Sequence, residues 1–148
     1  MDKQFKLYPL SNEILDICVD LFIDTFSKEP WNDVYDSRNQ VVDFFKNHMN
    51  NNYFVGYVLK EEDSIVALSI GMKKPWINGM EYYIDQFCVK VCMQGQGIGS
   101  LFMELIQEEI KTQGMNAIIL TTDKGFPSEI FNLKNGFNSL DELVVLAK

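Results

Sequence analysis

The stretch Gln94-Gly95-Gln96-Gly97-Ile98-Gly99-Ser100 is the part of this chain that decides its fold. It joins an apolar, β-branched segment, 82–91, to an amphipathic segment, 98–111, so the pattern predicts a strand, a glycine turn and a helix start. The first N–H groups of a helix lack intrahelical partners, and the helix dipole adds partial positive charge there. Such a turn is typical of an anion-binding site, and phosphate groups are its usual ligands.

The spacing of the glycines excludes two common phosphate-binding motifs. A dinucleotide-binding turn has Gly-x-Gly-x-x-Gly, but the residue three after Gly99 is Phe102. A Walker loop ends in Gly-Lys-Ser or Gly-Lys-Thr, which this sequence does not contain. The order Gln94, Gly97, Gly99 instead resembles the Gln/Arg-x-x-Gly-x-Gly/Ala signature of the GNAT acyl-CoA N-acyltransferases.

Length and charge limit the classes of protein to consider. The 148 residues predict a single domain, 1–148, with one core. The formal net charge of −8, from 13 basic and 21 acidic residues, disfavours nucleic acid and anionic membranes as partners and favours small cationic molecules. Charges within the first six residues and the lack of a long apolar run argue against a signal peptide or a membrane span. We therefore expect a cytoplasmic protein.

The cysteines and the histidine argue against metal and hydrolase chemistry. Cys18, Cys88 and Cys92 form no Cys-x-x-Cys pair, so we expect reduced thiols, no metal site and, without a nearby base, no covalent acyl-enzyme. The one histidine, His48, lies in a polar stretch and is expected to be a surface residue.

Hydrophobic periodicity predicts the remaining elements. A helix over 12–26 has acidic residues at 13, 16, 20 and 24, which form either a solvated outer face, the favoured interpretation, or a collar that attracts a cationic substrate. Asn78-Gly79 predicts a type I′ hairpin turn. Further strands are expected at 3–8, 53–60, 65–73, 80–91, 117–121 and 143–147, and further helices at 37–49, 98–111 and 128–135.

The loop between the first two predicted helices is the candidate acceptor site. Trp31, Asp33 and Asp36 are its candidate substrate-binding residues, because carboxylates beside an aromatic ring can hold an ammonium group. Trp31 can equally pin the loop to the core.

The resemblance to GNAT acetyltransferases extends over essentially the whole chain. The order of predicted elements is the family's, and 130–137 is similar to its late helix pattern, apolar-Tyr-x-x-x-Gly-Phe, with Gly136 and Phe137 as the final pair. The resemblance implies an α/β (α+β) GNAT fold. This fold has a central mixed, mostly antiparallel sheet, a parallel strand pair at the CoA cleft, and helices on both faces.

The resemblance also implies a cosubstrate, acetyl-CoA, and no metal. Its pyrophosphate would lie on the backbone of Gln94, Gly95, Gln96, Gly97, Ile98, Gly99 and Ser100, and its pantetheine arm along Phe87, Cys88 and Val89. Asn132 stands where many members have a proton-donating tyrosine. An amide is no acid, so Asn132 would only hydrogen-bond CoA, and the proton would come from water or from Tyr82 or Tyr83.

A general base is useful because an aliphatic amine is mostly protonated near pH 7. Asp85 is the first choice and Glu81 the second, since alternation along a strand places 81, 83, 85, 87 and 89 on one face. Asp85 could instead be a structural carboxylate.

We therefore expect an N-acetyltransferase acting by direct attack in a ternary complex on a small cationic amine, such as an aminosugar or a polyamine. The alternatives are a non-catalytic acyl-CoA-binding sensor and an enzyme that acetylates a protein N-terminus or lysine. A homodimer is also left open.

Overall fold

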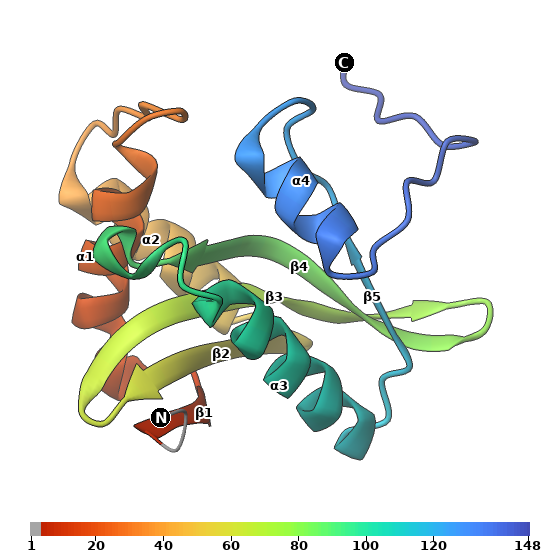
Figure 1. The fold of residues 1–148 in the computed structure, drawn as a ribbon, viewed down its shortest axis with the longest axis horizontal. Coiled ribbons are helices and arrows are strands. Elements are labelled where there is room, and N and C mark those ends of the chain that lie inside the picture. Colours follow the sequence, from red (N-terminus) through yellow and green to blue (C-terminus); the bar gives the residue numbers. More distant parts are fainter. Residues whose placement is uncertain (1–3) are drawn as a thin grey trace.

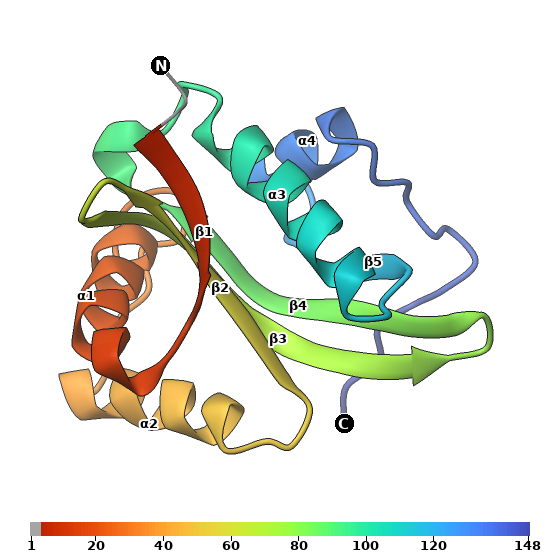
Figure 2. The same cartoon turned by 90° about the horizontal axis from the view of Figure 1, so that it is seen from below.

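One mixed sheet with helices on both faces forms the centre of the molecule (Figures 1 and 2). The computed structural model describes residues 4–148. The strand order is β1-β2-β3-β4-β5, antiparallel except for the parallel pair β4 and β5. This confirms the predicted fold class. The elements are β1 (Phe5–Pro9), a 3-10 turn η2 (Asn12–Ile14), α1 (Leu15–Phe26), α2 (Arg38–Met49), β2 (Phe54–Glu61), β3 (Ser64–Trp76), β4 (Gly79–Val89), η3 (Val91–Met93), α3 (Ile98–Thr112), β5 (Ala117–Leu120) and α4 (Pro127–Lys134).

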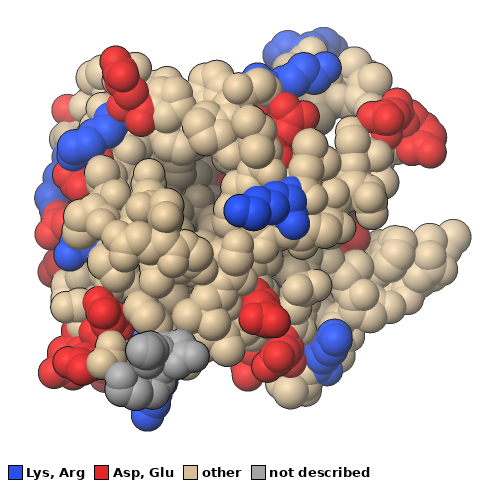
Figure 3. Space-filling model, in the orientation of Figure 1, with Lys and Arg blue, Asp and Glu red and all other residues tan. Residues whose placement is uncertain are grey.

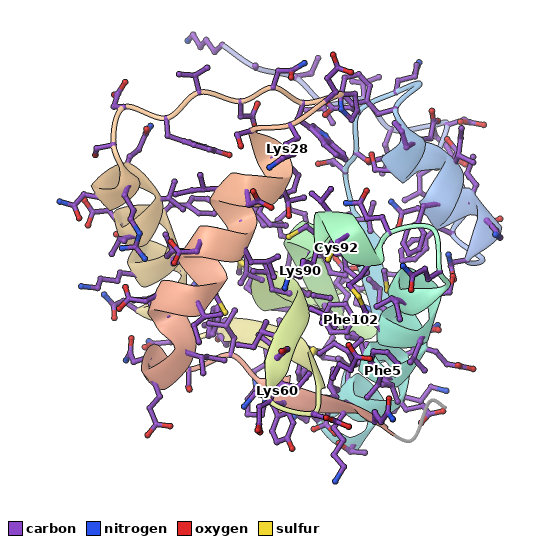
Figure 4. The ribbon with its side chains drawn as sticks, turned by 60° about the vertical axis from the view of Figure 1, so that its left-hand side comes forward. Phe5, Lys28, Lys60, Lys90, Cys92 and Phe102 are labelled. Carbon is purple, nitrogen blue, oxygen red and sulfur yellow. The ribbon has the colours of Figure 1, made fainter. Side chains whose placement is uncertain are left out.

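Each face of the sheet has its own apolar cluster. On the face covered by α1 and α2, Phe22 and Phe45 pack against Leu68 of β3. On the other face, Phe102 of α3 is fully buried with Tyr82 of β4 (Figure 4). The amphipathic periods of 98–111 and 12–26 therefore predicted correctly that each segment forms a helix with a buried face.

A β-bulge interrupts β4 at Asp85. Ile70 of β3 pairs with Gln86 and the next residue, Gly71, pairs with Ile84, so Asp85 has no partner across the ladder. The expectation that odd positions from 81 to 89 share one face was therefore wrong, because one extra residue changes the side to which the following side chains point.

The bulge also marks the end of pairing between β4 and β5. The parallel ladder covers 81–84 of β4, and its last pair is Ile84 with Leu120. Beyond it the strands diverge, β4 toward η3 and β5 toward α4 (Figure 1). The edge of β4 over 85–89 therefore has no neighbouring strand on the β5 side.

Two local predictions were wrong. Trp76 pairs with Gly79, so Ile77 and Asn78 are the central residues of the hairpin turn; neither has a positive φ, which excludes type I′. The predicted strand 143–147 does not form. A turn in which the Leu143 N–H donates to the Leu140 carbonyl directs the tail away from the sheet, and the side chains of 143–146 stay largely exposed (Figure 1).

The first strand is observed as β1, which runs through Pro9 rather than ending before it. The part of the prediction that falls on residue 3 lies outside the described residues.

Candidate active site

The glycine turn leads directly into α3, with Gly97 as the N-cap residue. Gly95 and Gly97 have φ values of +77° and +81°, in the left-handed region that glycine adopts without steric cost. A Cβ atom at either position would meet nothing within 4 Å. The backbone conformation, not crowding within the protein, therefore requires glycine at both positions.

A run of backbone N–H groups in this turn is unpaired. The first helical bond of α3 is from the Leu101 N–H to the Gly97 carbonyl, at 3.1 Å. In the part of the chain that the structure describes, no group accepts a hydrogen bond from the N–H groups of residues 95–100. These donors lie at the positive end of the α3 dipole and can therefore hold a pyrophosphate.

Two glutamine side chains hold the turn in place. Gln94 Nε2 donates to the Val89 carbonyl at 2.9 Å, and Gln96 Nε2 donates to the Cys92 carbonyl at 3.2 Å. Lys90 and Cys92 lie beside this turn in Figure 4. The glutamines therefore brace the chain between β4 and α3 and leave its N–H groups free.

Gly99 serves a different purpose from the other two glycines. A Cβ atom there would stand 2.9 Å from Phe131 Cε1, so Gly99 allows α3 to approach α4 closely. Phe131 also packs against Phe87 of β4, at 5.6 Å between ring centroids, and Phe87 stacks on Phe102 at 5.3 Å. These contacts link α4, β4 and α3 around the site.

A cavity of about 450 Å³ lies at the outer side of the turn. It opens to the surface beside the unpaired N–H groups of the turn. The part of a ligand that lies beyond a bound anionic group could therefore occupy it. Its walls come from the turn, from α3 and from the end of α4: Gly97, Ser100, Leu101, Met103, Glu104, Gln107 and Asn135.

The free edge of β4 presents alternate residues to the gap between β4 and β5. The Lys90 N–H donates to the Val66 carbonyl of β3 at 2.8 Å, and in an antiparallel ladder the groups of every second residue face the same neighbour. Cys88 therefore directs its N–H to β3, whereas Phe87 and Val89 direct theirs away from it. An extended ligand can pair with Phe87 and Val89 as an added strand would.

Asp85 makes a hydrogen bond that the sequence did not predict. Asp85 Oδ2 lies 2.8 Å from Nε2 of His48 on α2, and the side chains are 32% and 23% exposed. The His48 ring also packs edge-on against Phe44, at 4.9 Å between centroids. The expectation that His48 is a surface residue was wrong, because its partner lies 37 residues away in sequence and no local pattern indicates the pair.

The other candidate acids and bases differ in access. Glu81 is buried and pairs with Lys74 Nζ at 3.5 Å. Tyr82 is fully buried and hydrogen-bonds Ser69 Oγ at 2.5 Å, and burial raises its pKa, so it is a weaker acid than an exposed tyrosine and has no access to solvent. Tyr83 is half-buried next to Ile84 at the start of the bulge.

The two cysteines near the turn differ in burial. Burial raises the pKa of the Cys88 thiol to about 12, so the thiolate fraction at neutral pH is negligible. Cys92 is exposed.

Asn132 of α4 is buried, and within the described chain its side-chain amide makes no hydrogen bond, so the amide is free to bind a ligand group.

A second cavity lies on the α1 and α2 side of the sheet. This aromatic pocket has a volume of about 250 Å³, and Asp33 is its one charged wall residue. It reaches β4 at Gln86, the residue after Asp85. Phe22, Asp33, Tyr35, Gln40, Val41, Phe44 and Gln86 line it.

Tyr35 has an unusual environment in the aromatic pocket. Its hydroxyl is buried and makes no hydrogen bond of normal geometry with any described residue, although it lies near enough to the Asp33 carboxylate for a weak hydrogen bond to contribute to its pKa. Burial, with the negative charge of Asp33, raises the pKa of Tyr35 to about 12, so the hydroxyl stays neutral. A buried hydroxyl without a hydrogen bond of normal geometry is costly, by about 1–3 kcal/mol, unless a bound molecule pairs with it.

The other two candidate residues of this loop do not line the pocket. Trp31 packs edge-on against Phe26, at 5.2 Å, and lies 6.2 Å from Phe126, so it pins the loop as one of the two interpretations predicted. Asp36 is exposed, and its N–H donates to Gln40 Oε1 at 2.7 Å.

The acidic residues of α1 lie on the outer surface. Arg38 pairs with Asp16 at 3.2 Å and with Asp20 at 3.0 Å, and Lys28 pairs with Asp24 at 2.5 Å. These side chains are mostly solvent-exposed, which supports the interpretation as a solvated face. In Figure 3 the hollow between the α1–α2 part and the α4 part has walls almost free of charge.

The described residues contain neither a cluster of metal-binding side chains nor a helix that could span a membrane. No group of three or more metal-binding side chains occurs within residues 4–148. Across the same range, none of the helices has the length and apolar character that a membrane crossing requires.

Comparison with solved structures shows the same fold in acetyltransferases. An aminoglycoside acetyltransferase, meta-AAC0020, from an uncultured soil metagenomic sample in complex with sisomicin is 18% identical, with a TM-score of 0.75 over 99% of this chain and 97% of that chain. A possible acetyltransferase from Clostridium difficile 630 is 13% identical, with a TM-score of 0.81 over 98% and 97%. The aminoglycoside N-acetyltransferase AAC(6')-Iy in complex with CoA is 9% identical, with a TM-score of 0.75 over 97% and 94%.

Comparison with curated protein sequences finds no match. The family model described as the acetyltransferase (GNAT) family matches residues 13–137, from the start of the first helix to Phe137. That range contains the glycine turn, the bulged strand and both cavities. The chain therefore belongs to the GNAT acetyltransferase family.

Proposed function

We propose that this chain transfers an acetyl group from acetyl-CoA to a primary amine by direct attack in a ternary complex. The observation that carries the proposal is the position of the unpaired N–H groups of 95–100 at the end of the open edge of β4. The first feature suits a pyrophosphate and the second an extended amide-containing arm. Acyl-CoA has both, in that order along one molecule.

The donor is held mainly by backbone groups in this proposal. GNAT enzymes use acetyl-CoA, and the pyrophosphate would bind the turn while the pantetheine arm pairs with Phe87 and Val89. The buried amide of Asn132 would hydrogen-bond the arm from the α4 side. The cavity beside Gly97 and Ser100 leaves room for the rest of the nucleotide.

The reaction forms one bond and breaks one. The amine nitrogen attacks the thioester carbon, a C–N bond replaces the C–S bond, and CoA leaves as a thiolate that takes up a proton. A backbone N–H near Val89 on this open edge, such as that of Phe87 two residues from Asp85, would face the thioester oxygen, and a preorganised donor of this kind contributes about 2.7 to 4 kcal/mol to transition-state stabilisation.

Asp85 is the proposed general base. The bulge presents its carboxylate on the same face of the sheet as the aromatic pocket, and His48 holds one carboxylate oxygen. The amine proton would pass to this carboxylate. The burial of Tyr82 leaves water or Tyr83 to protonate the thiolate, which is in any case a weak base near neutral pH.

A small cationic amine is the proposed acceptor. Asp33 in the aromatic pocket and the net charge of −8 both favour a cation over an anion. The similarity of fold to two aminoglycoside acetyltransferases is consistent with a small amine but identifies none.

Two measurements test the proposal. Free CoA thiol should appear when the protein is mixed with acetyl-CoA and a panel of polyamines, aminoglycosides, amino acids and peptides. A thermal shift tests binding alone, since a ligand at 100 times its Kd adds about 2.7 kcal/mol of stability. A shift without thiol release would instead support the acyl-CoA sensor, and turnover with peptides alone would support a protein acceptor.

A further inference from the structure

We propose that the aromatic pocket binds a second, non-reacting ammonium group of the acceptor, so that the preferred substrates are compact diamines acetylated at one end. This inference rests on the proposed function. It specifies how many charged groups the acceptor carries and where each of them binds. The walls of the pocket, the requirements of the chemistry and the volume of the pocket all support it.

The walls of the pocket are suited to a cation. The ring of Phe22 lies 5.6 Å from that of Phe44 and 6.1 Å from that of Tyr35, and these rings line the cavity together with Asp33. Aromatic faces attract an ammonium group, and a carboxylate beside them adds a charge-assisted hydrogen bond. The buried Tyr35 hydroxyl makes no hydrogen bond of normal geometry among residues 4–148 and lies near Asp33, so its oxygen can accept a further hydrogen bond from the same group.

The chemistry shows that this ammonium group is not the nucleophile. An attacking nitrogen must be neutral, so it must give up its proton to a base beside the thioester, which is the role proposed for Asp85, whereas Asp33 in the aromatic pocket would only pair with the charged form of an amine. The nitrogen held by Asp33 therefore stays protonated, and a different nitrogen must attack.

The attacking amine of the same substrate would lie beside Asp85. Gln86 lines the aromatic pocket and directly follows Asp85 in β4. Phe44 lines it too, and its ring contacts His48, the partner of Asp85. The base therefore lies next to the pocket on the same face of the sheet, and a short chain can join an ammonium group in the pocket to an amine beside Asp85.

The volume of the pocket limits the size of the substrate. A buried apolar cavity of about 150 Å³ accommodates benzene, with six heavy atoms, so about 250 Å³ accommodates about ten. A four-carbon diamine has six heavy atoms and fits within this limit. An aminoglycoside of two or three rings exceeds it, so most of such a molecule would lie outside the aromatic pocket.

The test compares 1,4-diaminobutane with 1-butylamine, which has the same carbon chain and one amine fewer. Release of CoA thiol gives kcat/KM for both, and calorimetry in the presence of CoA gives binding without turnover. We expect the wild-type protein to prefer the diamine by about 20-fold after correction for its two equivalent ends, mainly through KM. The preference is moderate because Asp33 is exposed and water screens its charge.

The variant Asp33→Asn should reduce that preference to less than threefold, mainly by raising KM for the diamine. Asp43→Asn is the matched control, because it removes one negative charge from an exposed position of α2 that does not line the pocket. It should retain the wild-type preference.

Equal affinity of the wild-type protein for both amines would overturn the inference. An equal loss of kcat/KM for both amines in Asp33→Asn would overturn it too. Diamine binding that depends on Asp33 without thiol release would keep the pocket assignment and contradict the proposed acetyl transfer. The two proposals can therefore fail separately.

Discussion

The two sides of the sheet contribute different kinds of group to the proposed site. On the side of α3 and α4, the proposed donor half consists of backbone groups: the N–H groups of 95–100 and the open edge of β4. On the side of α1 and α2, the proposed acceptor half consists of side chains, namely the aromatic pocket and the pair Asp85 and His48. The donor half therefore depends on chain conformation and the acceptor half on individual residue types.

This difference predicts different responses to mutation. Backbone groups are lost only when the chain changes its conformation, so only a few positions, chiefly glycines, are sensitive in the donor half. A side-chain site can change one residue at a time and alter its ligand while the fold persists. The following substitutions test that contrast, from the largest expected effect to the smallest.

Gly97→Val should abolish binding of acetyl-CoA, with at least a 100-fold rise in Kd. A β-branched residue at a φ of +81° is strained, so the turn will reorient its N–H groups. Gly114→Val is the matched control, because Gly114 has a φ of +82° and equally open surroundings at the far end of α3. Calorimetry should show normal CoA affinity in the control. Thermal melts should show a similar loss of stability in Gly97→Val and Gly114→Val.

Normal CoA affinity in Gly97→Val would contradict the phosphate-binding role of the turn. Equal loss of affinity in Gly114→Val would mean that general destabilisation, and not the geometry of the turn, explains the effect.

Asp85→Asn should lower kcat/KM by about 100-fold at pH 7, within the range of general-base effects. The loss should shrink as the pH rises above 8, because aliphatic amines lose their own proton near pH 10.4 and then need no base. A pH–rate profile with saturating acetyl-CoA measures this. A uniform loss at every pH would show a structural role, and the same pH-dependent profile in Glu81→Gln instead would transfer the role to Glu81.

Gly99→Ala should destabilise the protein by about 1–3 kcal/mol, because the new methyl group meets the ring of Phe131 at 2.9 Å. Combination with Phe131→Leu should recover part of the loss, since the smaller side chain can move away. Urea denaturation of the four proteins of this double-mutant cycle measures the coupling. Additive losses would mean that the two residues are not in contact.

Arg38→Ala should change turnover little, because its ion pairs with Asp16 and Asp20 lie on the exposed outer face of α1. The substitution also frees two carboxylates. If these acidic residues attract the substrate, KM for a cationic amine should fall at low salt, and that result would restore the collar interpretation.

The fold was predictable because its signals are local. The glycine spacing at 94–100 and the amphipathic periods of 12–26 and 98–111 each indicate an element within a few residues. The strand expected at 143–147 shows the limit of such signals. Its β-branched residues suit a strand, but a strand also needs a partner edge, and the turn at 140–143 leads the chain away from β5.

The site was predictable where the backbone forms it and less so where side chains do. The turn was identified from its glycines alone, whereas of the three residues named in the acceptor loop only Asp33 lines the aromatic pocket. His48 was missed because its contact with Asp85 depends on how α2 packs on β4, which no local pattern encodes. The bulge was missed for a related reason: the segment 80–91 reads as a regular strand, and only its register with β3 reveals the extra residue.

That extra residue gives β4 an unusual sensitivity to changes in length. Loss of one residue between Ile84 and Gln86 would restore regular alternation, and β5 could then stay paired with β4 for longer. The gap that separates the two strands would close, and Asp85 would no longer be presented to α2. Surface loops usually tolerate insertions and deletions, but at this position we expect a single deletion to convert a ligand-binding edge into continuous sheet, so chain length here should be under stronger selection than residue type.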